Sequence, residues 1–227
     1  MPDAPKSGRA ARAGLKVVPI DLRAVERERL IRAVGRELAR AGFRGLTPQG
    51  VAEAAGTPLR ALYRQFGGLS GLVAAFARSG EFWPPAAELA EDGAEVLRGL
   101  PPDRLMAAFF KRLLAALLRR PQTLAILAWE EVERHALAEE LEWPRARCAL
   151  EFFELMEQDP PEDVDLTALV LVLAGAVHFL AVRSRVHCSL GGVDLHSETG
   201  WARIEGILDR TLAAVLGSGR GGPGNGA

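Results

Sequence analysis

Apolar residues recur at helical spacing along most of this chain of 227 residues. In two clear series they stand three or four positions apart, which places them on one face of a helix. The series are Leu30, Val34, Leu38 and Ala41, then Leu105, Phe109, Leu113 and Leu117. No stretch shows the sustained alternation of apolar and polar residues that strands show. The pattern therefore predicts an all-α fold.

Glycine and proline divide this pattern into segments. They interrupt it at 42–47, 56–58, 67–70, 83–85, 99–102, 121, 144, 159–161 and 191–192. Because such residues begin or end helices, we expect about nine helices. After residue 100 the expected helices extend over 103–120, 122–141, 145–158, 165–187 and 198–216.

The segment 47–66 carries two helix starts in close succession. A threonine-proline pair at 47–48 offers a capping hydroxyl and a proline at the first helical position. Gly56 closes this short helix, and a second pair at 57–58 opens a helix over 59–66. Two helices joined by so tight a turn cross steeply. The pattern predicts a helix-turn-helix, whose second helix is offered to the major groove of DNA.

The distribution of charge supports this interpretation, although the total does not. The net charge of the whole chain is only -1. Residues 1–70, however, hold 13 Lys and Arg against 6 Asp and Glu, a balance of +7, and the remainder has a balance of -8. A basic first third on an acidic remainder favours a nucleic-acid-facing module joined to a part with another purpose.

The same region resembles the TetR-like bacterial transcriptional regulators. The resemblance covers residues 29 to about 72 and rests on Ala41-Gly42-Phe43, Thr47, Val51-Ala52, Ala55-Gly56-Thr57, Leu62-Tyr63 and Phe66. It implies a DNA-binding domain of three helices, a larger helical ligand-binding and dimerisation domain, and repression relieved by a small molecule. The expected boundaries are a flexible basic arm at 1–21, the DNA-binding domain at 22–69, the larger domain at 70–216 and a flexible glycine-rich tail at 217–227.

The resemblance also implies which residues contact double-stranded DNA. Thr47 and Thr57 would each cap a helix whose positive end faces a phosphate, and the Tyr63 hydroxyl would bind another phosphate. Arg60 would read guanine through its guanidinium, and Leu59 would touch a thymine methyl group or a sugar. The expected DNA-binding set is completed by a residue nearer the DNA backbone, Arg64.

Two departures from the family pattern keep an alternative open. Pro58 stands where many members have Ser or Thr, and Leu69 stands where many have Lys, which removes one expected phosphate contact. The arm with Lys6, Arg9, Arg12 and Lys16 either compensates along the DNA or is only a solubilising end. The alternative function is a helical protein-interaction or ligand-carrier protein with degenerate DNA binding.

The aromatic residues of the larger part have two interpretations. Stripes at helical spacing are commonly plain core. The resemblance nevertheless implies a pocket for a small, largely apolar effector, near Phe109, Leu113, Trp129, Phe152 and His178. Glu131 and His135 have the spacing of a metal pair, but residues 129–135 are better interpreted as a charged outer face. We expect no metal and no cofactor.

The last two expected helices carry the dimerisation signal. Between Asp165 and Arg183 lie 17 uncharged residues, which favour a helix buried on all sides, in a core or between subunits, over a membrane span. Resembling proteins pair these helices with their symmetry mates in a four-helix bundle. The expected homodimer interface consists of Leu169, Val172, Leu173, Ala176, Leu180, Trp201, Ile204, Leu208 and Leu212.

Other functional classes find little support. No nucleophile, base and oxyanion donor stand at a convincing spacing, so we do not expect an enzyme. Two cysteines, Cys148 and Cys188, without paired spacing exclude a disulfide scaffold and indicate a reducing compartment. The N-terminus lacks the apolar stretch of a secretory signal. We expect a cytoplasmic protein that does not associate with membranes.

Overall fold

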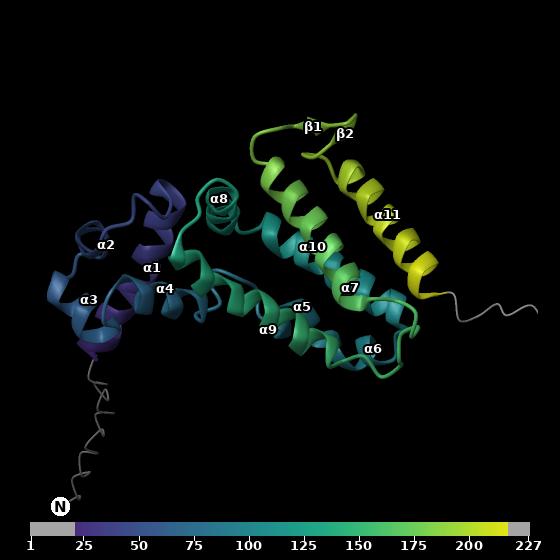
Figure 1. Cartoon of the computed structure of the whole chain (residues 1–227), viewed down its shortest axis with the longest axis horizontal. Helices are drawn as coiled ribbons and strands as arrows, with labels where there is room; N and C mark the ends of the chain where they lie inside the picture. Colours follow the sequence, from purple (N-terminus) through teal and green to yellow (C-terminus); the bar gives the residue numbers. More distant parts are fainter. Residues whose placement is uncertain (1–20, 218–227) are drawn as a thin grey trace, which may run out of the picture.

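The computed structural model describes residues 21–217, except for the side chain of Asp92. These residues form eleven α-helices, two 3₁₀ helices and one small hairpin (Figure 1). The helices are α1 (Leu22–Ala41), α2 (Pro48–Ala55), α3 (Leu59–Phe66), α4 (Leu69–Ala77), α5 (Ala86–Ala90), η1 (Glu91–Gly93), α6 (Ala94–Arg98), α7 (Pro102–Leu118), α8 (Pro121–Glu130), η2 (Ala136–Leu141), α9 (Glu142–Phe153), α10 (Leu166–Arg183) and α11 (Glu198–Leu216). The predicted all-α class is confirmed.

The sequence pattern did not indicate the hairpin between α10 and α11. Strands β1 (Ser189–Leu190) and β2 (Val193–Asp194) pair antiparallel around two glycines. Gly191 and Gly192 have φ values of 57° and 79°. A two-residue turn with positive φ at both positions matches the twist of the paired strands, and glycine adopts it without steric cost.

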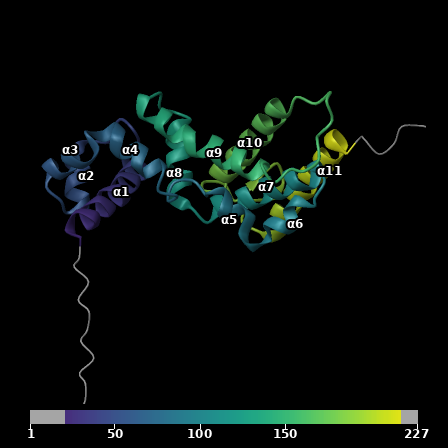
Figure 2. The same ribbon diagram turned by 90° about the horizontal axis from the view of Figure 1, so that it is seen from below.

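The helices form two groups along the long axis of the molecule. Helices α1 to α4 lie together at one end, and the rest of the helices form the larger group (Figures 1 and 2). The smaller group is held by fully buried side chains from α1, α2 and α3, namely Leu30, Val34, Leu38, Val51 and Leu62. Since α4 packs against both α1 and η2, the domain boundary near residue 70 stays a prediction.

The helix expected over 122–141 is interrupted in the structure. Helix α8 ends at Glu130, and the chain is irregular until η2 begins at Ala136. The His135 side chain caps η2, because its Nδ1 accepts the N–H of Leu137 at 3.1 Å. The next helix, expected over 145–158, instead starts at Glu142 and ends at Phe153. It contains Pro144 in its first turn, where the missing N–H needs no helical partner.

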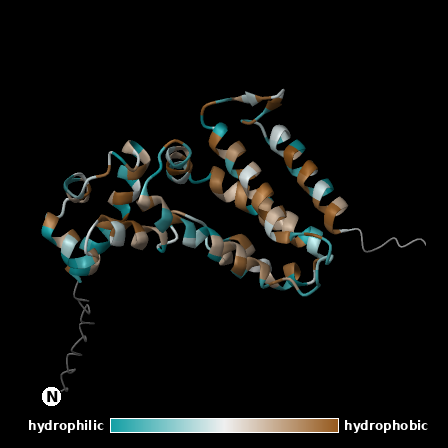
Figure 3. Cartoon of the chain, viewed as in Figure 1, coloured by the Kyte–Doolittle hydropathy of each residue, from teal (hydrophilic) through white to brown (hydrophobic). Residues whose placement is uncertain are grey.

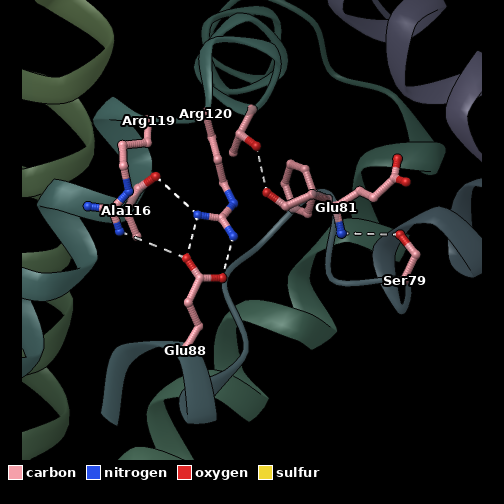
Figure 4. A network of polar contacts seen from close by, with 8 residues as sticks. Ser79, Glu81, Glu88, Ala116, Arg119 and Arg120 are labelled. Atoms are coloured by element: carbon pink, nitrogen blue, oxygen red, sulfur yellow. Dashed lines mark hydrogen bonds and ion pairs between the residues drawn. The ribbon is translucent and has the colours of Figure 1, made fainter. Parts of the chain in front are cut away.

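Ion pairs and hydrogen bonds fix the joint between α5 and the α7–α8 turn (Figure 4). The Arg120 guanidinium donates to both carboxylate oxygens of Glu88, at 2.9 and 2.5 Å. It also donates to the Ala116 carbonyl at 3.2 Å. Nearby, the buried Thr123 hydroxyl donates to the Phe82 carbonyl at 2.6 Å. These contacts hold the start of α8 against α5 and against the segment that leads into it.

Helix α10 is apolar along most of its length, but one chain alone does not bury it (Figure 3). Only Leu173, Val177 and Ala181 of this helix are buried. By length and composition it is the one helix in residues 21–217 that could cross a membrane. The expectation of burial on all sides within a core is therefore wrong for the single chain. The alternative of burial between subunits stays a prediction.

Candidate nucleic-acid interface

The turn between α2 and α3 is built by local signals. The Thr47 hydroxyl caps α2 by accepting the N–H of Gly50 at 3.1 Å, and Pro48 occupies the first turn. Gly56 ends α2 in the left-handed conformation, with φ 61°. The N–H of Thr57 then donates to the Ala52 carbonyl at 3.0 Å. Thr47 and Gly56 therefore act as the sequence predicts, and they set the tight turn between the two helices.

The predicted cap by Thr57 is wrong. The N-terminal cap of α3 is Pro58, in an extended conformation and without a side-chain hydrogen bond. The Thr57 hydroxyl oxygen is buried and has no hydrogen-bond partner among the described residues. Pro58 stands between Thr57 and the first residue of α3, so the Thr57 hydroxyl does not bind the free N–H groups at the start of this helix. A contact of Thr57 with DNA stays a prediction.

One face of α3 is free of packing. Arg60, Tyr63 and Arg64 follow i, i+3, i+4 spacing and are exposed, with Tyr63 exposed to 49%. Ala61 and Leu62 point the other way and are buried. Leu59 is half-buried. Three of the predicted contact residues therefore share one solvent-facing stripe, which the buried face of the helix holds in place.

Two contacts with α1 bear on this stripe. The Arg64 guanidinium donates to the Glu26 carboxylate at 3.1 Å, in an exposed ion pair. The Arg27 guanidinium lies 4.6 Å from the centre of the Phe66 ring. Arg27 adds a cation beside the end of α3 that lies outside the helix-turn-helix motif. The basic arm with Lys6, Arg9, Arg12 and Lys16 lies outside the described residues.

The residues expected to line an apolar pocket have different surroundings. Phe109, Leu113 and Phe152 are buried in the hydrophobic core, where the ring centres of Phe109 and Phe152 are 5.2 Å apart. The Trp129 indole N–H donates to the carbonyl of Ala39 in α1 at 3.2 Å. Of the five, His178 alone lines a cavity between the end of α8, η2, α9 and α10. The apolar pocket stays a prediction.

A cavity of about 440 Å³ lies between the end of α8, η2, α9 and α10. We call it the polar cavity, because its lining includes Glu130, Glu131, Glu133, Glu142, Arg145 and His178. The expected charged outer face over 129–135 is therefore wrong in part, since the side chain of Glu130 is only 14% exposed. Nothing in the local sequence pattern marks this burial, because Arg145 and His178 come from later helices.

Arg145 is the central cation of the polar cavity. Its guanidinium donates to Glu130 at 2.5 Å and to Glu142 at 2.6 Å. It also lies 5.5 Å from the centre of the Trp83 ring. Burial raises the pKa of Glu130 and the neighbouring Arg145 opposes this rise. Burial, helped by the charge of Arg145, lowers the pKa of His178 to about 4, so this imidazole is neutral near pH 7.

The wall of the polar cavity touches the end of α1. Glu133 Oε2 accepts the backbone N–H of Phe43 at 2.7 Å and that of Arg44 at 3.2 Å. The rings of Phe43 and His135 stack with their centres 6.0 Å apart. The contact is tight, because a Cβ added at Gly42, whose φ is 69°, would lie 2.9 Å from Glu133 and Trp129. The helix-turn-helix and the polar cavity thus share one contact region.

A second contact joins the two groups at the start of α4. The Ser70 hydroxyl donates to the Glu140 carboxylate of η2 at 2.6 Å. The segment from Glu133 to Glu140 therefore touches the smaller helical group at both of its ends. Glu133 contacts the end of α1, and Glu140 contacts α4.

The predicted dimer residues fall into two sets. Leu173, Leu208 and Leu212 are buried within the chain. Val172 and Ala176 are exposed, and Leu169, Leu180, Trp201 and Ile204 are half-buried. A largely apolar groove of about 520 Å³ between α10 and α11 is lined by Leu173, Ala176, Leu180, Ile204 and Leu208, among others. Elsewhere on α10, Leu171 and Phe179 are exposed to 72% and 55%.

Within residues 21–217, no three His, Cys, Asp or Glu side chains gather in a way that could hold a metal ion. Both cysteines are free, Cys148 buried and Cys188 exposed.

No protein-family model matches the chain, and no curated protein matches it by sequence. Solved structures do match it. NalD from Pseudomonas aeruginosa, described as the secondary repressor of the MexAB-OprM multidrug efflux pump, is 17% identical, with a TM-score of 0.60 over 88% of this chain and 99% of NalD. A transcriptional regulator from Rhodococcus sp. RHA1 is 21% identical, with a TM-score of 0.57 over 87% and 99%.

A TetR-family transcriptional regulator from Haemophilus influenzae is 17% identical, with a TM-score of 0.56 over 87% of this chain and 100% of that one. All three matches extend through both helical groups and include nearly the whole of the other protein. At this level of identity they show the fold. The chain has the all-α fold of the TetR-family transcriptional regulators, with an N-terminal helix-turn-helix and a larger C-terminal helical part.

Proposed function

We propose that the protein is a ligand-responsive transcriptional regulator that binds a pseudo-palindromic DNA operator as a homodimer and leaves it when a small effector binds. The observation that carries this proposal is the exposed stripe of Arg60, Tyr63 and Arg64 on a helix that follows a tight, capped turn. The similar structures are those of transcriptional regulators, which supports a role in regulation, and NalD is described as a repressor.

The shape of α3 suits the major groove. An eight-residue helix is about 12 Å long, close to the width of that groove. Leu62 anchors it in the core of the smaller group, so its outer face has a defined orientation. Arg60, in the first turn, would bind guanine O6 and N7, and the Tyr63 hydroxyl would donate to a phosphate. Thr47 would bring the capped end of α2 to another phosphate.

A second copy of the chain is the proposed occupant of the exposed α10 face. One chain carries one recognition helix, and a pseudo-palindrome is read by two. The largely apolar groove between α10 and α11, and the exposed Leu171 and Val172 of the same helix, leave α10 with more apolar surface than one chain covers. Apolar patches of this kind mark interaction sites. Burial between subunits would also account for α10 without a membrane, in a cytoplasmic protein.

Two observations favour the alternative of a helical protein-interaction or ligand-carrier protein with degenerate DNA binding. Arg64 is paired with Glu26, and Leu69 stands where many members of the family have a phosphate-binding lysine. In that case the cationic surface would be weakened at two positions. An exposed ion pair is worth only about 0–1 kcal/mol, however, so a phosphate could displace Glu26 at little cost.

A mobility-shift assay with the DNA upstream of the protein's own gene tests the proposal. Wild-type protein should retard a fragment of this region and should not retard an unrelated fragment at the same concentration. Arg104→Ala, an exposed arginine of α7, serves as the matched control for changes on α3. If Arg60→Ala and Tyr63→Phe both shifted the fragment like wild type, α3 would not be the reading helix.

A further inference from the structure

We propose that the polar cavity binds a small organic cation, and that the bound cation competes for Glu133 with the backbone N–H groups of Phe43 and Arg44. The inference rests on the proposed function, since it names the effector class and the contact through which the effector acts on the DNA-binding helices. It differs from the largely apolar effector that the family resemblance implies, whose pocket stays a prediction.

The charge of the lining favours a cation. Four glutamates, Glu130, Glu131, Glu133 and Glu142, face two arginines, Arg134 and Arg145. Arg145 is shared between two of the carboxylates. In residues 21–217, neither Glu131 nor Arg134 forms an ion pair, and within the lining the carboxylates outnumber the arginines by two. A ligand anion is repelled here and a ligand cation is attracted.

Unsatisfied acceptors point to a ligand that donates hydrogen bonds. Glu130 Oε1 and His178 Nε2 are buried and have no hydrogen-bond partner among the described residues. Buried polar groups are nearly always paired, so such atoms call for a partner. The neutral His178 accepts at Nε2 when its proton is on Nδ1. A protonated amine, with three N–H groups, can donate to both once the side chains part to admit it.

Arg145 Nε is also buried without a partner, and a cation does not satisfy it. The guanidinium plane of Arg145 lies against the Phe82 and Trp83 rings, 5.3 and 5.5 Å from their centres. Its charge is already balanced by Glu130 and Glu142. A ligand anion could reach this nitrogen only by approaching those two carboxylates.

The size of the cavity and its apolar lining indicate how large the ligand is and where its apolar part binds. A volume of about 440 Å³ falls within the range of small-molecule sites. Leu127, Ala138 and Val182 supply apolar lining. An adjoining hollow of about 350 Å³ shares Glu131 and Val182 with the cavity and contains Phe179. Because Arg183 and Arg185 also line this hollow, the cationic group belongs in the polar cavity and an apolar tail belongs here.

Glu133 links the cavity to the DNA-binding helices. Glu133 is one of the residues that line the cavity, and its carboxylate holds the two N–H groups just after α1. A cation that draws this carboxylate inward weakens both hydrogen bonds. Since α1 packs on α2 and α3, a displaced end of α1 changes the position of the reading helix. Linkage then requires that DNA and cation lower each other's affinity by the same factor.

Three probes of matched size test the ligand class by calorimetry on the full-length protein without DNA. They are 4-phenylbutylamine, 4-phenylbutanol and 4-phenylbutanoate, which differ in charge at pH 7.5. We expect the amine to bind at least about tenfold more tightly than the alcohol, and the carboxylate to bind most weakly. Glu131→Gln should weaken amine binding several-fold. Glu139→Gln, an exposed change in the neighbouring η2 that does not line the cavity, should leave it unchanged.

The proposal is overturned if the amine does not bind, if it binds no more tightly than the alcohol, or if the two glutamine variants lose equal affinity. The link through Glu133 has its own readout, hydrogen exchange at the amides of Phe43 and Arg44. The amine should speed exchange at these two amides and leave the amide of Thr57, held by the Ala52 carbonyl, unchanged. Unchanged exchange at Phe43 and Arg44 with the amine bound would overturn the link.

Failure of the site and failure of the proposed function are distinguishable. If the protein binds the amine but no DNA, the proposed ligand site stands and the proposed regulator function is contradicted. If it binds DNA but not the amine, only the proposed ligand site is contradicted.

Discussion

Glu133 accepts the backbone N–H of Phe43 at 2.7 Å, although 90 positions separate the two residues. Phe43 follows α1 in the smaller helical group, and Glu133 follows α8 in the larger one. The carboxylate also accepts the N–H of Arg44. Hydrogen bonds to a charged acceptor are roughly twice as strong as neutral ones. This side chain therefore fixes the end of α1 against the larger group, together with the Trp129–Ala39 and Ser70–Glu140 hydrogen bonds.

Removing the Glu133 carboxylate should destabilise the protein. Glu133→Ala leaves two N–H groups without their acceptor, and we expect the free energy of unfolding to fall by about 1–3 kcal/mol. Glu133→Gln keeps an acceptor oxygen and should lose less. Urea denaturation followed by tryptophan fluorescence measures both. Glu139→Ala, exposed in η2, is the control, and a loss no greater than that of the control would mean that the contact contributes nothing.

Gly42→Ala should be costly for a different reason. The backbone at Gly42 has φ 69°, and a Cβ there would lie 2.9 Å from Glu133 and Trp129. Strain and crowding together should lower the free energy of unfolding by about 1–3 kcal/mol. Gly99, with φ -72° and only a distant neighbour for a Cβ, provides the control. Thermal unfolding should show a lower Tm for Gly42→Ala than for Gly99→Ala, and the reverse order would contradict the geometry.

Changes on α3 should separate affinity from specificity. Arg60→Ala should relax the preference for one base pair, worth about 1–3 kcal/mol of discrimination. Tyr63→Phe should weaken binding by a similar factor for every sequence, since a phosphate contact carries no base information. Competition binding against a set of single-base variants of the operator distinguishes the two. Identical selectivity profiles for wild type and Arg60→Ala would show that this arginine reads no base.

A charge on the exposed face of α10 should disrupt the homodimer. Val172 is exposed to 68% in the single chain, and Val172→Glu would bury an unpaired carboxylate in the interface. Sedimentation analysis should find a dimer for wild type and a monomer for Val172→Glu. Leu150→Glu on α9 alters an equally exposed apolar residue, at 69%, and should remain dimeric. If Val172→Glu also stayed dimeric, the interface would lie elsewhere.

His178 should make the protein less stable in acid. Burial and Arg145 lower the pKa of this residue from 6.5 to about 4. Between these two pH values His178 is therefore protonated in the unfolded chain and neutral in the folded chain. The free energy of unfolding contributed by His178 is complete above pH 6.5 and falls as the pH drops towards 4. Between pH 7.5 and pH 5 the loss is about 2 kcal/mol.

The variant His178→Asn should lack this loss, and His187→Asn, at an exposed histidine, should retain it. Burial raises the pKa of Glu130, which acts in the opposite direction because the folded state then holds the extra proton. Glu130 is present in both variants, so the difference between their unfolding curves at the two pH values isolates His178. Equal pH dependence in the two variants would show that His178 titrates normally.

The parts of the fold that short-range signals govern could be predicted. Thr47, Pro48 and Gly56 begin and end α2 through contacts within a few positions, so the helix-turn-helix was visible in the sequence. The predicted cap by Thr57 is wrong, because this threonine-proline pair stands one residue too far from its helix to cap it. The predicted helix start after Pro144 is also wrong, since a helix tolerates proline in its first turn.

The polar cavity could not be predicted, because its residues meet only in the folded chain. Residues 129–135 have the composition of a charged helical face, yet α8 stops at Glu130. Glu133 then bonds to the end of α1, and Glu130 is buried by Arg145 from the next helix. None of these partners lies within one helical turn, so hydrophobic periodicity carries no trace of them. For α10 the sequence left burial in a core and burial between subunits both open, because periodicity cannot tell a helix buried in its own chain from one that faces outward.

The central claim is that α3 and its mate in a second copy bind operator DNA. The most direct measurement is fluorescence anisotropy of a labelled duplex, taken from the region upstream of the protein's own gene, titrated with full-length protein at 50 and 200 mM salt. We expect specific binding that weakens at least about a hundredfold between these concentrations, because phosphate contacts release counterions. Absence of binding, or a Kd that does not change with salt, would contradict it.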